Sequence, residues 1–328
     1  MCLTSCEDIL GQWDKPTPAT PAAGAVDETI AAAPGEYLEW STADSKLVIK
    51  DIPAGYTSMT NATTSWNGNY IVDSDVTIDN DVTISGDVNI ILKDGFTLKV
   101  NKRVSGAYKL CIFAQNSDAA SAGKLVIEPD AAATSSSSAL SVAELQIHGG
   151  NITATGHDNA SSYDGDDGIK TSGKLFVYSG KVTATAGAHS GGSNMGGIGI
   201  NCGGNELHVY KAEVNATGGN TTSSGSTGNG IACGGTAGDP CLTIDGGTVT
   251  AKAGDATGAT AGIRCTWLTV NSGKLFAQGN TAAAGKGFDG SVLYFSAGLT
   301  AKGGSDGVNY PNSYSNGQDP EDKYLKVE

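Results

Sequence analysis

One short phrase recurs through the second half of the chain, and its period restricts the possible folds. It begins at Leu145 as LQIHGGNITATG, and further copies begin at Leu175, Leu207, Leu242, Leu268 and Leu293. Successive copies start 30, 32, 35, 26 and 25 residues apart. Self-similarity at a period of about 20 to 50 residues indicates a stacked-repeat architecture, because one unit alone cannot bury its apolar face.

A second phrase lies between each two successive copies of the first. It reads GIKT at Gly168, GINC at Gly199, GIAC at Gly230, GIRC at Gly262 and GFDG at Gly287. Apolar and polar residues alternate with period two in these phrases and in residues 70–100, which predicts half-buried strands. Glycine suits the corners because it has no Cβ. The sequence therefore predicts an all-β fold, a single-stranded parallel β-helix over residues 67–309, with roughly eight to eleven coils.

The motifs also resemble those of a known family. GDVNIILKDGFTLKV, followed by LTIDGGTVTAKAG and AGI, is similar to secreted bacterial proteins described as carbohydrate-binding-domain-containing. The resemblance covers about residues 66–305 and implies a right-handed, pectin-lyase-like β-helix. It also implies polysaccharide binding, with calcium in certain members, although GIRCT and GIKTS depart from the family's glycine-rich phrase. Such motifs specify the coil far better than the function.

The two ends of the chain lie outside the repeats. LTSCED, residues 3–8, matches a bacterial lipobox with Cys6 as the acylated residue, and the acidic pair after it suggests the outer face of a Gram-negative outer membrane. The hydrophobic region before it is missing, so the printed start could be truncated. Residues 1–36 form the lipobox remnant and a Pro/Ala/Thr-rich tether. We expect residues 37–66 and 310–328 to cap the solenoid, with Tyr324 and Leu325 folding back.

Charge and cysteine positions exclude some partners and sites. The formal net charge is −14, which disfavours nucleic acid and leaves the lipid anchor as the only membrane contact. Cys202, Cys233 and Cys265 occupy the same slot of consecutive second phrases, so we expect them to stack inward as buried free thiols. A disulfide between them is not excluded by distance, but parallel Cβ vectors disfavour it. A metal site is also disfavoured, because these slots hold no His or acidic residue that could complete the set of ligands.

One outward face of the first phrase is rich in rings. With Leu and Ile or Val inward, alternation places a set of side chains outward on three consecutive coils: His148, Phe176, Tyr178, His208 and Tyr210. Flat rings beside hydrogen-bonding groups suit sugar rings, so this face is a candidate glycan platform. The alternative is that the rings stabilise the sheet, or that another segment covers them, with residues 37–66 as the candidate cover.

The sequence leaves three functions open. We expect a non-catalytic, surface-exposed lipoprotein that binds extracellular polysaccharide or a host or cell-surface glycan. The second hypothesis is an adhesin or structural stalk that binds a protein partner. The third is a calcium-dependent polysaccharide lyase, in which Lys170 would be the base. For this third function Asp164, Asp166 and Asp167 would hold calcium, since clustered acidic oxygens are its preferred ligands.

Overall fold

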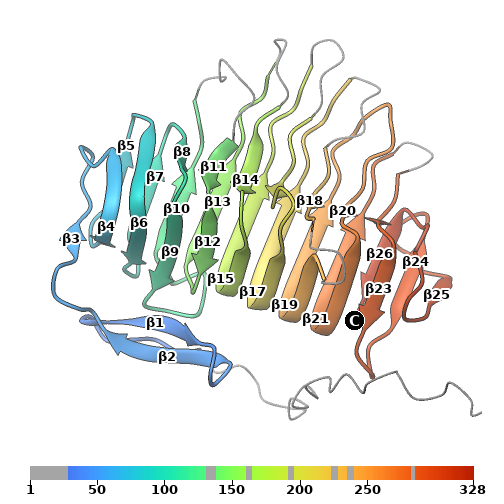
Figure 1. Ribbon diagram of the computed structural model, residues 1–328, viewed down its shortest axis with the longest axis horizontal. Helices are drawn as coiled ribbons and strands as arrows, with labels where there is room; N and C mark the ends of the chain where they lie inside the picture. The colour runs from blue at the N-terminus through green and yellow to red at the C-terminus, as the bar shows by residue number, and fades with distance from the viewer. Residues whose placement is uncertain are drawn as a thin grey trace, which may run out of the picture.

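The computed structural model describes residues 29–130, 138–159, 165–190, 196–222, 228–234, 240–281 and 285–328. In these residues all regular elements are strands, and they form one large, mostly parallel sheet (Figure 1). The predicted all-β class is therefore confirmed. Cys6, Asp164 and most of the predicted tether lie outside the described residues. Within the described residues no helix has the length and apolar character needed to span a membrane.

The parallel strands form three ladders. The first ladder begins near the N-terminal end and follows the Leu-containing phrase. Its strands are, in order, β3 (Thr57–Ser58), β4 (Ser65–Val72), β6 (Val82–Leu92), β9 (Lys109–Ala114), β12 (Glu144–Ile147), β15 (Leu175–Thr185), β17 (Leu207–Thr217), β19 (Leu242–Lys252), β21 (Trp267–Gln278) and β23 (Val292–Phe295).

The second and third ladders run beside the first. The second joins β5 (Val76–Ile78), β7 (Thr97–Val100), β10 (Lys124–Ile127), β13 (Asn151–Thr155) and the C-terminal halves of β15, β17, β19 and β21. The third joins the N-terminal parts of β4 and β6 to β8 (Val104–Gly106), β11 (Ser138–Val142), β14 (Asp167–Thr171), β16 (Ile200–Asn201), β18 (Ile231–Ala232), β20 (Ile263–Arg264) and β22 (Phe288–Asp289).

Equivalent slots of successive phrases pair in register, which builds the core from columns of like residues. The leucines that open the first phrase pair in a series: Leu145, Leu175, Leu207, Leu242, Leu268 and Leu293. All of them are fully buried. The column of Cys202, Cys233 and Cys265 is also buried, and all three thiols are free, which confirms the prediction from their spacing.

The glycine of the second phrase sits where two coils approach closely. A Cβ on Gly199 would lie 2.6 Å from the carbonyl oxygen of Gly230 and 2.7 Å from the amide nitrogen of Thr217. Gly230 has the same relation to Gly262 and Lys252. No side chain fits between backbones at this distance, so these glycines are required for the corner and not only favoured there.

A hairpin packs along the stack, beginning near its N-terminal end. Strands β1 (Glu36–Ser41) and β2 (Lys46–Asp51) pair antiparallel, and their turn is closed by hydrogen bonds between Ser41 and Asp44. In Figure 1 the hairpin lies below the strands and runs along the stack; Leu38 bridges to Ala114 of β9. Residues 37–66, predicted to be a cap, therefore divide into this hairpin and a segment in which Met59 and Trp66 are buried in the core.

The C-terminal end of the stack is finished by reversed strands. Strands β24 (Ala301–Gly304) and β25 (Asn312–Tyr314) pair antiparallel. The last strand, β26 (Tyr324–Val327), pairs antiparallel with both β21 and β24, and it buries Leu325 and Val327 against the core. An antiparallel strand at this position occupies the edge that a further coil would otherwise extend.

We expect Gly199→Ala to lower the free energy of unfolding by about 1 to 3 kcal/mol, because the added Cβ forces two coils apart. Gly204→Ala is the matched control, since a Cβ there meets nothing within 4 Å. The control should stay within about 0.5 kcal/mol of the parent protein. Urea unfolding followed by circular dichroism measures both, and equal stability of the two variants would contradict the close approach described above.

Candidate functional site

Four side-chain rings form a row on the outward face of the first strand ladder, one ring on each of four successive coils. Phe113, His148, Tyr178 and Tyr210 occupy equivalent positions in successive coils. The ring centroids are 4.5 Å apart from Phe113 to His148, 4.7 Å from His148 to Tyr178 and 5.0 Å from Tyr178 to Tyr210. Because the strands pair in register, neighbouring rings are separated by nearly the distance between parallel strands. This distance lies in the favourable range for ring pairs.

A second row lies two residues earlier on the same face. Gln146, Phe176 and His208 pair in register, and the rings of Phe176 and His208 stack at 5.3 Å. Phe176 also stacks with Tyr178 of its own strand at 5.8 Å, with nearly parallel planes. The two rows therefore form one continuous ring cluster, as the alternation of the sequence predicts for the five residues of the proposed platform.

The hairpin covers one of the two rows. Trp40 packs its ring over Tyr178 at 5.7 Å and Tyr210 at 5.2 Å, and its backbone N–H donates a hydrogen bond of 2.9 Å to Nδ1 of His148. His148 and Tyr178 are consequently only 6% and 5% exposed. These two predicted platform residues are thus covered by the hairpin, whereas Phe176, His208 and Tyr210 remain half-buried.

Two members of the ring cluster were missed from the sequence. Phe113 follows Leu110 at the same offset as His148 follows Leu145, so the alignment of LCIFAQ with LQIHGG would have identified it. No pattern in the sequence points to Trp40, because its place depends on how a non-repeating hairpin docks on the stack.

Burial fixes the protonation state of His148. Desolvation, with a smaller contribution from the positive charge of Lys109, lowers its pKa from 6.5 to about 4. Only the neutral ring has a lone pair on Nδ1 to accept the hydrogen bond from Trp40. The hairpin is therefore fastened to the sheet by a contact that protonation of one side chain would break.

The exposed row is bordered by fixed hydrogen-bonding groups. Glu206 binds Nε2 of His208 and Nζ of Lys174, each at 2.9 Å, and these contacts lower the pKa of Glu206. Two coils earlier, the amide of Gln146 donates a hydrogen bond of 2.7 Å to Glu144. Half-buried rings with ordered carboxylate, amide and imidazole groups beside them are thus present on one surface.

A cavity lies beside the covered row, at the tip of the hairpin. Its volume is about 280 Å³. It is lined by residues of the hairpin, of the chain on its N-terminal side and of neighbouring coils: Thr29, Ile30, Lys46, Leu47, Ser117, Asp118, Ser179 and Lys211. Lys211 and Ser179 directly follow Tyr210 and Tyr178 in the sequence, so the cavity adjoins the covered row.

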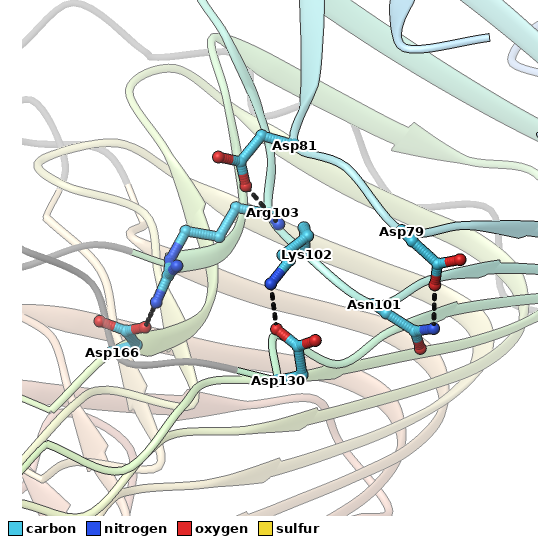
Figure 2. A network of polar contacts seen from close by, with 7 residues as sticks. All are labelled: Asp79, Asp81, Asn101, Lys102, Arg103, Asp130 and Asp166. Carbon is cyan, nitrogen blue, oxygen red and sulfur yellow. Dashed lines mark hydrogen bonds and ion pairs between the residues drawn. The ribbon is translucent and has the colours of Figure 1, made fainter. Parts of the chain in front are cut away.

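The residues considered for calcium binding are engaged with other partners. Oδ2 of Asp166 forms an ion pair of 2.5 Å with Nη2 of Arg103, and the Asp166 side chain is buried (Figure 2). Asp167 accepts hydrogen bonds from the backbone N–H of Ile198 at 2.7 Å and from the amide of Asn201 at 2.9 Å. In the part of the chain that the structure describes, no group of three or more His, Cys, Asp or Glu side chains is placed to hold a metal ion. Asp166 and Asp167 are therefore held by protein groups, whereas Asp164 lies outside the described residues.

The other aspartates near Arg103 connect neighbouring coils. Oδ1 of Asp81 accepts the backbone N–H of Arg103 at 3.1 Å, and Oδ1 of Asp79 accepts the side-chain amide of Asn101 at 2.7 Å (Figure 2). Lys102 forms an ion pair with Asp130 of the next coil. Asp75 and Asp87 likewise accept backbone N–H groups 22 residues further along the chain. This acidic stretch satisfies backbone groups at the corners and is structural.

Lys170 is exposed on β14, where it pairs in register with Ser141 and Asn201. Neither neighbour is a carboxylate that could hold a metal against an acidic sugar. The residue proposed as a lyase base therefore stands apart from the ring cluster, on the third ladder.

We expect the hairpin to loosen as the pH falls from about 6.5 to about 4. A histidine with a lowered pKa stabilises the docked state fully above its ordinary pKa, and this contribution is lost as the pH falls toward the lowered value. The full loss is about 3 kcal/mol, from the difference between the two pKa values. Hydrogen exchange of residues 36–51, measured across this range, should show protection falling.

His148→Gln tests the cause, since the glutamine oxygen can accept the same hydrogen bond and does not titrate. The variant should remove most of the pH dependence of exchange in the hairpin, and His208→Gln is the control that should leave it intact. An unchanged pH dependence in His148→Gln would assign the loosening to another group.

Comparison of the chain with protein-family models, with curated proteins and with solved structures gives no match. The functional interpretation therefore rests on the geometry of the ring cluster and its borders.

Proposed function

We propose that this chain is a non-catalytic glycan-binding protein whose binding surface is the exposed row formed by Gln146, Phe176 and His208. We further propose that its stacked ladders form a right-handed, single-stranded, pectin-lyase-like β-helix. The observation that supports the binding proposal most is that these rings stay half-exposed while the adjacent row is covered by Trp40.

The chemistry of the surface suits a sugar. The C–H face of a pyranose packs on a flat apolar ring, and its hydroxyl groups need fixed polar partners at the ring's edge. Phe176 offers the apolar ring, and the stacked imidazole of His208 extends it across the next coil. Glu206, Glu144 and Gln146 provide oxygen acceptors at the border, and Lys174 provides a donor.

Electrostatics favour a neutral glycan over an acidic one. The contacts to Glu206 lower its pKa, so its carboxylate is ionised at neutral pH, and the chain has a formal net charge of −14. Sugar hydroxyl groups donate well to carboxylates, whereas polyuronates would be repelled by them. The proposed ligand is therefore a neutral polysaccharide or a neutral segment of a surface glycan.

The direction of the ladder supports a chain-like ligand. The exposed row spans three coils, two of which contribute a ring, so the surface extends along the stack. A polymer that lies across several coils gathers many weak contacts, which is how a shallow surface reaches useful affinity.

We expect the double variant Phe176→Ala with His208→Ala to lose at least about tenfold of its affinity for a neutral polysaccharide, as removal of two stacking rings costs more than about 1.4 kcal/mol. Affinity electrophoresis against a panel of neutral and acidic polysaccharides, chosen from a glycan array, measures the retention. Phe276→Ala, which removes a half-buried ring from the second ladder, is the matched control and should retain binding.

Two other outcomes would contradict the proposal. Lys46→Ala with Lys211→Ala alters the cavity at the hairpin tip, and loss of binding in that variant alone would move the site there. Absence of retention by every polysaccharide and every array glycan would favour the stalk with a protein partner.

Lipid anchoring at Cys6, with display of the folded body on the outer face of a Gram-negative outer membrane, completes the proposed function. It is supported by the LTSCED motif at residues 3–8. We expect a full-length precursor that carries an export signal to incorporate radiolabelled palmitate in a Gram-negative host, and Cys6→Ala to abolish the label. Labelling that persists in Cys6→Ala would remove the anchor from the proposal.

A further inference from the structure

Four buried thiols gather at the corner between the third and the first ladders. Three of them form the column of Cys202, Cys233 and Cys265, in which backbone hydrogen bonds connect one coil to the next. The fourth, Cys241, precedes the first-phrase strand β19 and is also free and buried. The cluster is not part of the proposed glycan surface.

Cys241 and Cys265 meet across two neighbouring coils. The backbone N–H of Cys241 donates to the carbonyl oxygen of Trp267 at 2.9 Å, and Sγ of Cys265 lies 3.7 Å from the same oxygen. Each thiol shifts the pKa of the other, because the two side chains are close enough to interact. The backbone of Cys241 and the sulfur of Cys265 therefore meet at one peptide group, and both thiols are free.

Position distinguishes this pair from the column. Cys202 and Cys233 also interact through their side chains. They occupy the same slot of parallel strands, however, so their Cα–Cβ bonds point the same way, which is poor geometry for a disulfide. Cys241 and Cys265 occupy different slots, one on each side of the corner. Their Cα–Cβ bonds are not constrained to be parallel, so the two side chains can approach each other.

The corner also stabilises a negative charge on one sulfur. Interaction with the Cys265 thiol, and to a smaller extent with Trp267 and Thr266, lowers the pKa of Cys241 to about 6. Burial raises the pKa of Cys265 well above its ordinary value. At neutral pH the pair therefore combines a thiolate with a protonated thiol, the division of roles that an attacking and a resolving cysteine have.

We propose that Cys241 and Cys265 are a redox-active pair, which a disulfide-containing oxidant converts into a disulfide that links two adjacent coils. In the first step the Cys241 thiolate attacks one sulfur of the oxidant, forms a mixed disulfide and releases one thiolate. In the second step Cys265 loses its proton and attacks the Cys241 sulfur, which releases the second half of the oxidant as a thiol. The two cysteines lose two electrons and the oxidant gains them.

The burial of Cys241 means that the first step follows a local opening of the corner, so the reaction is slower than that of a free thiol. The test uses the full chain with Cys2→Ser and Cys6→Ser, so that the two cysteines near the start do not compete. The protein is incubated under native conditions at pH 7.5 with oxidised glutathione, and intact mass and disulfide-linked peptides are measured over time.

We expect this protein to lose two hydrogen atoms and to yield a peptide that links Cys241 to Cys265. Cys265→Ser should stop at the first step and accumulate one glutathione on Cys241. Cys241→Ser should form neither the disulfide nor the glutathione adduct. Cys111→Ser, which removes a buried thiol elsewhere, should react like the parent.

The result on the parent decides the proposal even if a variant fails to fold. No reaction of the folded parent, a link between Cys202 and Cys233, or unchanged product formation in folded Cys241→Ser would each overturn it. Circular dichroism before and after oxidation verifies that the reacting species is folded.

Discussion

In-register stacking of parallel strands is the constraint on which the rest of this structure depends. Because each strand lies about 4.8 Å from the next, whatever occupies a slot in one coil must tolerate its counterpart in the neighbouring coil. Inward slots are therefore filled by columns of Leu, Ile, Val and Ala, which form one buried core. At Gly199 and Gly230 the coils come so close that no side chain fits, and the repeat keeps glycine there.

The same constraint explains where the polar groups are found. Backbone N–H groups at the corners lack a ladder partner, and each needs an acceptor from a side chain or from water. Aspartates one coil earlier supply the missing acceptors, as Asp81 does for Arg103 and Asp75 does for Thr97. The acidic composition of this stretch thus has a structural cause, which reduces its value as an indication of calcium binding.

The repeat allowed the ladders, the buried cysteine column and the shared face of the five ring residues to be predicted, because a period converts sequence position into spatial position. The features that it did not reveal involve parts of the chain without a period. Trp40 reaches Tyr178 from a hairpin that occurs once, and its docking is decided by tertiary packing. Cys241 occupies a slot that holds a thiol in one coil only, so alignment of the phrases gives no reason to pair it with Cys265.

Stacking of rings has two opposite consequences for binding. Each ring in a ladder contacts its neighbours through its faces, and the faces are what a sugar would need. In a fully stacked row, such as Phe113, His148 and Tyr178, the ring faces contact one another and are not free for a sugar. Trp40 then covers this row. At Phe176 the row begins beside Gln146 instead of a ring, so the ladder ends there and ring surface remains. A binding surface on this fold is therefore expected where a ring ladder terminates, and not where it is longest.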